Sequence, residues 1–354
     1  MSEKTSKKTS KKTTYEKSDT RSDTDIINAD VRKCAVIGCG NVGATIAYTL
    51  MQSELFSELV LIDIDPRKAQ GEAEDIAHGL PFHSPMAIYS GNYKDIADAA
   101  LVIITAGAPQ KAGESRMDLI HKNEQIFADI VDKISATDPR GIILVVSNPV
   151  DILTYLTLVR SGLPACRVIG SGTVLDTARL KQLVGERLGV DSRNVHTFII
   201  GEHGDSEVAV FSSANVSGVD LSCFCSECAC GCDPRRFEDI FLDVRDAAYR
   251  IIAAKGATYY AIAEAVRRIA VAIVRDEHTI LPVSTLADGY YGISDVCIGL
   301  PCIVGRGGIE KVLQIPLDAG ELEKLRRSAE SVRAVINSLG ERYTAPAPAP
   351  APSN

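Results

Sequence analysis

Three glycines spaced as in GxGxxG constrain the fold of this 354-residue chain more than any other feature. They are Gly38, Gly40 and Gly43, and they stand between an apolar run at 34–37 and a helix-like segment at 42–50. Asp63 follows about 20 residues later, at the end of a second apolar run. A strand, a glycine turn, a helix and an acidic residue in this order are typical of a doubly wound fold that binds a dinucleotide.

The residue types at these positions favour NAD over NADP. Glycines let the backbone approach a pyrophosphate, and the N-terminus of the following helix stabilises its negative charge. The Asp63 carboxylate would accept hydrogen bonds from ribose hydroxyls and would repel a 2′-phosphate. The structural alternative is a simple glycine turn with Asp63 capping a loop. The spacing of the whole unit favours the cofactor site.

Strand-like and helical segments alternate along the first half of the chain, which predicts a largely parallel sheet with helices on both faces. Further strands are expected at 59–64, 101–105 and 142–146, and helices at 117–135 and at 67–78, with Gly79 as the C-cap of the latter. Beyond 176 the helices lengthen, and we expect strands that alternate in and out at 279–287 and 297–304. The predicted organisation is an N-terminal Rossmann domain over 31–174 and a C-terminal mixed α+β catalytic domain over 175–340.

Both ends of the chain lack the apolar content of a folded domain. Residues 1–30 are rich in Lys, Ser, Thr and Asp, and 341–354 contain an Ala-Pro alternation, so we expect a disordered tail at each end. A nucleic-acid arm is the alternative for the Lys-rich start, but the net charge of −8 and the lack of a basic stripe predict no nucleic-acid partner. No apolar run approaches the roughly 20 residues that span a bilayer, so we expect no membrane partner. Without an export signal, the ten cysteines are expected to be reduced and the protein cytoplasmic.

A histidine in a glycine-containing loop, Gly201-Glu202-His203-Gly204-Asp205-Ser206, follows an apolar strand. Histidine is suited to exchanging a proton with an alcohol because its pKa lies near working pH. Three more motifs accompany it, at 106–116, 147–151 and 172–179. With these motifs in this order, the chain from about Val31 to Leu339 resembles the lactate and malate dehydrogenase family. The resemblance implies hydride exchange between NAD and a 2-hydroxy acid.

The resemblance also implies roles for single residues. His203 would exchange the substrate proton, and Asp176 would fix its tautomer. Arg179 would bind the substrate carboxylate, and Arg116, on a closing loop, would stabilise charge on the reacting oxygen. An ordinary helical ion pair and a solvated loop charge are the alternatives for these residues. The resemblance adds Asn148 and Thr258 to the substrate pocket, and Asn41, Val42, Lys68, Tyr93, Gly107, Ala108, Val146, Asn148 and Ser171 to the cofactor site.

Gln110, six residues before Arg116, bears on the substrate. By resemblance, malate dehydrogenases carry a second arginine there and lactate dehydrogenases carry glutamine. A dicarboxylate entering beside a neutral amide would lack a partner for its second charge. We therefore predict interconversion of L-lactate and pyruvate. The alternatives are an L-malate dehydrogenase and a non-catalytic NAD-binding protein.

The remaining expectations concern regulation, assembly and metal binding. Lys181 and His196 stand where related bacterial enzymes bind fructose 1,6-bisphosphate, although those enzymes carry arginine in place of Lys181, so this effector is an open alternative. The resemblance implies a homotetramer or homodimer, of which we expect the homotetramer. Cys225 and Cys228 form one CxxC pair within a cluster that also holds Cys223, Cys230 and Cys232. No second knuckle accompanies it, so we expect no metal.

Overall fold

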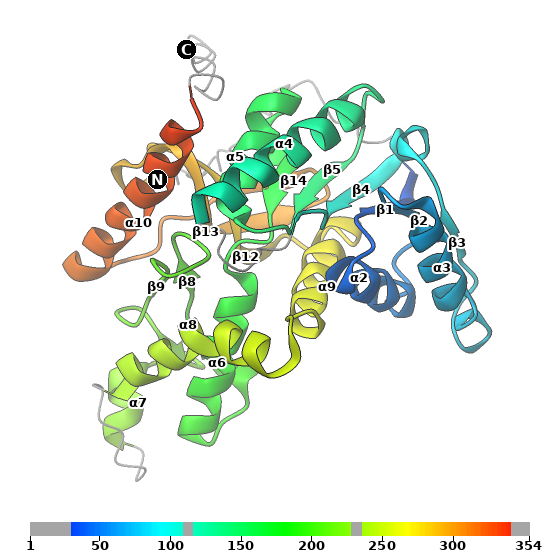
Figure 1. Ribbon diagram of the computed structural model, residues 1–354. Coiled ribbons are helices and arrows are strands. Elements are labelled where there is room, and N and C mark those ends of the chain that lie inside the picture. The colour runs from blue at the N-terminus through cyan, green and yellow to red at the C-terminus, as the bar shows by residue number, and fades with distance from the viewer. Residues whose placement is uncertain (1–29, 109–115, 228–235, 341–354) are drawn as a thin grey trace, which may run out of the picture.

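A nine-stranded sheet forms the centre of the computed structural model, which describes residues 30–108, 116–227 and 236–340. Its strand order is β14-β13-β12-β6-β5-β4-β1-β2-β3, and helices cover both faces (Figure 1). The first six strands are β1 (Asp30–Ile37), β2 (Glu58–Ile62), β3 (Ala87–Ser90), β4 (Ala99–Ile104), β5 (Ile142–Val145) and β6 (Val168–Gly170).

These six strands are all parallel, which confirms the predicted doubly wound half. Cys34 of β1 pairs with Leu59 of β2 on one side and with Leu101 of β4 on the other. All six residues of β4 are buried, because helices cover both faces of the sheet. The connecting helices are α2 (Asn41–Gln52), α3 (Pro66–Ala77), α4 (Arg116–Ser135) and α5 (Val150–Ser161).

The second half of the chain extends the same sheet with three antiparallel strands, β12 (Thr279–Asp288), β13 (Ser294–Gly305) and β14 (Gly308–Val312). Ser284 of β12 pairs with Gly170 of β6, where a Cβ on the glycine would lie 2.7 Å from the Cβ of Ser284. The predicted alternation of β12 and β13 is wrong. Most of their residues are buried on both faces, because α5, α6 (Val174–Leu188), α9 (Tyr260–Val274) and α10 (Ala319–Ser338) pack against them.

Of the remaining helices, α6, α7 (Leu221–Glu227) and α8 (Arg236–Lys255) contribute to a second, smaller hydrophobic cluster, whereas α9 and α10 pack against the large sheet. This cluster includes Leu180 and Val244, which belong to the packed helices α6 and α8. The helices are α6 (Val174–Leu188), α7 (Leu221–Glu227), α8 (Arg236–Lys255), α9 (Tyr260–Val274) and α10 (Ala319–Ser338). The short strands are β7 (Val195–His196), β8 (Ile199–Ile200), β9 (Val208–Ala209), β10 (Asn215–Val216) and β11 (Val219–Asp220).

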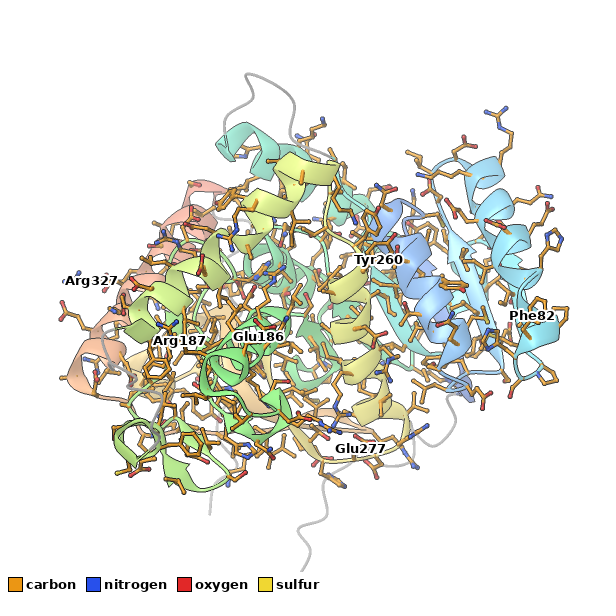
Figure 2. The ribbon with its side chains drawn as sticks, turned by 90° about the horizontal axis from the view of Figure 1, so that it is seen from below. Phe82, Glu186, Arg187, Tyr260, Glu277 and Arg327 are labelled. Atoms are coloured by element: carbon orange, nitrogen blue, oxygen red, sulfur yellow. The ribbon has the colours of Figure 1, made fainter. Side chains whose placement is uncertain are left out.

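Within the described residues, 3-10 helices join the larger elements at Leu80–Phe82, Tyr93–Ile96, Ala165–Arg167, Ser192–Asn194 and Tyr290–Gly292. Phe82 lies at the outer edge of the parallel half, at the opposite end of the molecule from Arg327 of α10 (Figure 2). Gly79 is not the C-cap of α3 that we predicted. Its φ is −78°, and the cap of α3 is His78. Within the described ranges, no helix has both the length and the apolar character needed to cross a membrane.

Candidate active site

His203 lies in the loop between β8 and β9, and hydrogen bonds of the backbone groups of Gly201 and His203 hold the first part of this loop. Gly201 exchanges two hydrogen bonds with Gly299 of β13, at 2.9 and 2.8 Å, and adopts a φ of +91° that favours glycine. The backbone N–H of His203 donates to Asp151 Oδ2 at 2.7 Å. The position of the histidine is therefore set by the large sheet and by the start of α5.

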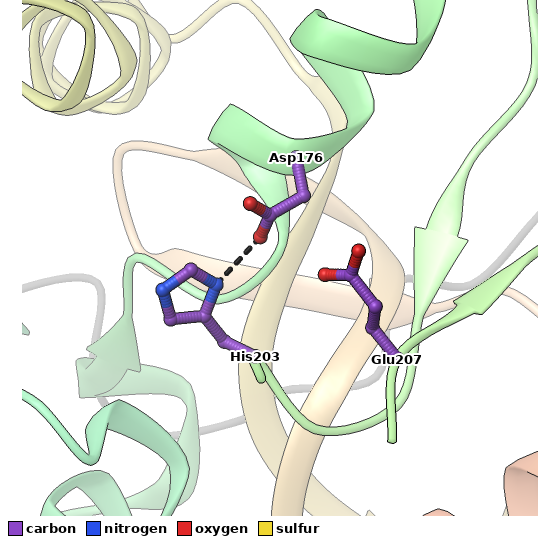
Figure 3. A group of neighbouring side chains, drawn as sticks. All are labelled: Asp176, His203 and Glu207. Atoms are coloured by element: carbon purple, nitrogen blue, oxygen red, sulfur yellow. Dashed lines mark hydrogen bonds and ion pairs between the residues drawn. The ribbon is translucent and has the colours of Figure 1, made fainter. Parts of the chain in front are cut away.

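The His203 ring contacts the carboxylate of Asp176, in the first turn of α6. His203 Nδ1 lies 2.5 Å from Asp176 Oδ2 (Figure 3). Arg179 Nη1 donates to Asp176 Oδ1 at 2.8 Å. Asp176 is buried, whereas 26% of the His203 side chain is exposed. Because Nδ1 is hydrogen-bonded to Asp176, Nε2 is the ring nitrogen available for proton exchange.

Charge near the ring favours its protonated form. Burial lowers the pKa of His203, but the charge and hydrogen bond of Asp176 outweigh this effect, and Asp151 and Glu207 add to it, so the pKa is raised to about 9. Burial also raises the pKa of Asp176, but the charge and hydrogen bond of His203, followed by the charge of Arg179, bring it below its ordinary value. At neutral pH the pair is therefore an imidazolium and a carboxylate.

Two further buried carboxyl groups near His203 were missed by the sequence reasoning. Asp151 accepts from His203 N and, through Oδ1, from the Ser284 hydroxyl at 2.6 Å, and burial raises its pKa to about 6. Glu207 lies four residues after His203, beside the His203–Asp176 pair. Asp151 ends the motif at 147–151 and Glu207 directly follows the motif at 201–206, but neither position indicates burial, because an acidic residue near a helix start or in a loop is usually solvated.

A pocket of about 780 Å³ lies at the carboxyl ends of β1, β2 and β4, where a doubly wound fold binds its cofactor. Seven predicted cofactor residues line it: Gly38, Gly40, Asp63, Lys68, Tyr93, Gly107 and Ala108. Ile126 and Ile130 of α4 also line it, and we did not predict them. Their apolar side chains suit the flat face of a nucleotide base.

The glycine turn fits a pyrophosphate. A Cβ on Gly43 would lie 1.8 Å from the carbonyl oxygen of Gly38, so Gly43 lets α2 pack closely against the turn. A Cβ on Gly40 would meet no protein atom within 4 Å, which leaves open space in front of the helix N-terminus. Asp63 accepts backbone N–H groups of Cys39 at 2.7 Å and Asp65 at 3.0 Å, which holds its carboxylate at the pocket wall. These features fit NAD.

Asn123 of α4 joins two predicted segments. Its Oδ1 accepts from Ala108 N at 2.8 Å, and its Nδ2 donates to the Asn148 carbonyl at 3.2 Å. Val146 and Ser171, at the ends of β5 and β6, donate backbone N–H groups to the neighbouring strands. The predicted residues Asn41, Val42, Val146, Asn148 and Ser171 lie outside the residues that line the pocket.

The other predicted positions have different surroundings. Thr258 is half-buried between α8 and α9, and Arg116 begins α4, with its side chain outside the described residues. Gln110 lies wholly outside them.

Lys181 is half-buried on α6, His196 is exposed on β7, and these two elements pack together. In the cysteine cluster, Cys223 is exposed on α7, whereas the side chain of Cys225 and all of Cys228, Cys230 and Cys232 lie outside the described residues.

Sequence comparison identifies two family models on this chain. Residues 32–170 match the NAD binding domain of lactate/malate dehydrogenase, and residues 173–342 match the α/β C-terminal domain of the same family. The first match confirms the prediction of NAD. The chain is 52% identical to an L-lactate dehydrogenase of Acetivibrio thermocellus, over 88% of this chain and 98% of that protein. It is 50% identical to an L-lactate dehydrogenase of a Thermoanaerobacter species, over 87% and 99%.

Solved structures give the same result. A lactate dehydrogenase from a deep-sea metagenome library of the Medee basin has a TM-score of 0.85 and 44% identity, and the match covers 87% of this chain and 98% of that one. The ligands-bound minor L-lactate dehydrogenase of Enterococcus mundtii has a TM-score of 0.85 and 40% identity, over 88% and 99%. With both halves matched in sequence and in fold, the chain belongs to the lactate/malate dehydrogenase family.

Proposed function

We propose that this chain is an L-lactate dehydrogenase that interconverts L-lactate and pyruvate with NAD, and that His203 exchanges the substrate proton. The contact of 2.5 Å between His203 Nδ1 and Asp176 Oδ2 carries this proposal, because it holds a charged imidazolium in a fixed orientation with Nε2 available. The relatives at 52% and 50% identity named above are L-lactate dehydrogenases, which favours this activity over that of a malate dehydrogenase.

The cofactor, when bound, supplies the hydride acceptor or donor. In pyruvate reduction, His203 donates its Nε2 proton to the oxygen that becomes the lactate hydroxyl, and Asp176 stabilises the imidazolium before transfer. In lactate oxidation the neutral ring accepts the same proton. Pyruvate reduction therefore requires the protonated ring and is lost as the pH rises through the pKa of His203, while lactate oxidation requires the neutral ring.

Arg179 is our candidate for binding the substrate carboxylate. One of its N–H groups is used by Asp176, which orients the guanidinium, and its fork can pair with a carboxylate through the others. Arg116 and Asn148 are the candidates for contacting the reacting oxygen, and Thr258 for a wall of the pocket. These roles rest on the motifs of the family to which the chain belongs.

The substrate is tested by steady-state kinetics with NADH and either pyruvate or oxaloacetate. We expect kcat/KM to favour pyruvate, and Gln110→Arg to shift the preference toward oxaloacetate, because the new guanidinium would pair with the second carboxylate. A preference of the natural chain for oxaloacetate would identify a malate dehydrogenase instead.

Catalysis itself is tested with His203→Ala. The variant should lose turnover and keep NADH binding, because His203 does not line the cofactor pocket. Tight NADH binding without turnover in the natural chain would point to a non-catalytic NAD-binding protein.

Regulation by fructose 1,6-bisphosphate is a further part of the proposal. Lys181 is half-buried on α6, which packs against the strand that carries His196, and burial lowers the pKa of Lys181. The negative charge of a bound phosphate would stabilise the half-buried ammonium group. Pyruvate kinetics that do not respond to the bisphosphate would remove this part.

We also propose a homotetramer in the cytoplasm. The exposed apolar side chains Ile251 and Ile252 of α8 and Tyr48 of α2 are candidates for subunit contacts. A cytoplasmic location is supported by the substrates, since pyruvate and NAD both occur in that compartment. Light scattering gives the assembly, and cell fractionation gives the location.

A further inference from the structure

Glu207 is a buried carboxyl group whose place is not explained by the fold or by the proposed roles. It is 7% exposed, and its Oε1 has no hydrogen-bond partner among the residues that the structure describes. Burying a polar atom without a partner is costly, so such an atom points to a function. The backbone N–H of Glu207 donates to the Gly204 carbonyl at 3.2 Å, which fixes the turn between it and His203.

The Glu207 side chain points toward the His203–Asp176 pair (Figure 3). One oxygen of each carboxyl group and one ring nitrogen all lie within 4.8 Å of one another. A shared metal ion does not fit this geometry. The 2.5 Å between His203 Nδ1 and Asp176 Oδ2 is a hydrogen-bond distance, whereas two ligands of one tetrahedral zinc ion stand about 3.3 Å apart.

The charged groups around Glu207 are Asp176 and Arg179 of α6, His203 of the same loop, and Arg245 of α8. Both arginines are paired with other carboxylates, Arg179 with Asp176 at 2.8 Å and Arg245 with Asp246 at 3.0 Å. Burial, followed by the charge of Asp176, raises the pKa of Glu207 to about 8, although His203 and the arginines oppose this rise. Glu207 is therefore a neutral acid at pH 7 and a carboxylate above pH 8.

We propose that Glu207 is a positioning residue that acts through His203, and that its buried carboxyl group controls how tightly the ring holds its proton. The inference rests on the proposed role of His203. Below pH 8 Asp176 and Asp151 supply the negative charge beside the ring, and above pH 8 ionised Glu207 joins them. The imidazolium is then stabilised most in the range where protons in solution become scarce. Glu207 thus extends pyruvate reduction to alkaline pH.

The test is Glu207→Gln, since glutamine has nearly the shape of the protonated acid. With saturating NADH, kcat/KM for pyruvate is measured from pH 5.5 to 10. We expect equal values at pH 6, and an alkaline limb that falls about one pH unit earlier in the variant, which is about a tenfold loss at pH 9.5. Glu207→Asp, which keeps an ionisable group, should restore part of the shift. Glu323→Gln, an exposed glutamate of α10, should leave the profile unchanged.

A second readout separates this inference from the proposed function. Diethyl pyrocarbonate modifies neutral histidine, so the rate of modification of His203 against pH, read by peptide mass spectrometry, gives the ring pKa without any turnover. We expect a lower pKa in Glu207→Gln. An unchanged ring pKa, or a loss of kcat/KM that is equal at all pH values, overturns the role of Glu207. A lowered ring pKa in a chain without turnover would support Glu207 and refute the proposed function.

Discussion

Replacing Asp176 with asparagine removes one charge from the centre of the site and changes little of its shape. The asparagine can still face His203 Nδ1, which now lies 2.5 Å from Asp176 Oδ2, and can still contact Arg179. What is lost is the negative charge that keeps the ring protonated and the acceptor that selects its tautomer. We expect a large decrease of pyruvate reduction that depends strongly on pH.

The size of the decrease follows from the pKa of His203, which is about 9 with Asp176 in place. Without that charge, burial lowers the pKa of the ring while Asp151 and Glu207 raise it, and we take the ordinary value of about 6.5 as the result. The difference of about 2.5 pH units corresponds to about 3.4 kcal/mol. At pH 8 the protonated fraction would fall from about nine tenths to about 3%, a loss of about 30-fold in kcat/KM before any loss of orientation.

The assay is kcat/KM for pyruvate between pH 5.5 and 9.5 at saturating NADH. At pH 5.5 the variant ring is again mostly protonated, so the deficit that remains there measures orientation alone. Asp132→Asn, at an exposed aspartate paired with Arg160, is the matched control and should behave like the natural chain. A deficit in Asp176→Asn that is the same at every pH would refute the argument that Asp176 acts by keeping His203 protonated.

Three further predictions test the cofactor turn, the substrate clamp and the buried carboxyl group. Gly40→Ala should weaken NADH binding at least tenfold with little change in Tm, because the new methyl meets open space, whereas Gly43→Ala should lower the Tm, because its methyl would lie 1.8 Å from a backbone oxygen. Titration with NADH and thermal unfolding separate the two. Arg179→Lys should raise KM for pyruvate, costing about 2 kcal/mol or about 30-fold in kcat/KM, because the bidentate fork is lost; an unchanged KM would exclude Arg179 from the clamp. The pKa of Glu207 is raised from its ordinary value to about 8, so natural stability falls as pH rises from about 4.5 to 8, and Glu207→Gln should unfold at a higher temperature at pH 8 but not at pH 5; equal melting temperatures at pH 8 would contradict this.

The parallel half of the fold was predictable from the sequence because its signals are local. Strands buried on both faces appear as continuous apolar runs, as in β4, and the glycine turn joins β1 to α2 within a few residues. The antiparallel extension was not predictable to the same degree. A run such as β12 indicates a strand, but its pairing with β6 joins Ser284 to Gly170, and no local pattern encodes a contact between residues so distant in the chain.

The site divides in the same way. His203, Asp176 and Arg179 stand in motifs whose order could be compared with a family, and the structure brings these three side chains together. The roles of Asp151, at the end of the motif at 147–151, and of Glu207 could not be found by that route, because what distinguishes these two residues is burial. A carboxyl group acquires an unusual proton affinity from its surroundings in three dimensions, and the sequence alone does not contain those surroundings.

The pairing of β6 with β12 connects the proton-exchanging histidine and the cofactor pocket to the same sheet. Ser284 pairs with Gly170, the last residue of β6, and its hydroxyl donates to Asp151. Asp151 in turn accepts from the backbone N–H of His203. His203 is thereby linked by hydrogen bonds to the same sheet whose strand ends form the cofactor pocket. A hinge between separately folded lobes would let the distance between hydride and proton transfer vary with every opening motion. Here both centres are attached to one continuous hydrogen-bonded sheet, so we expect that distance to change little when substrate enters and leaves.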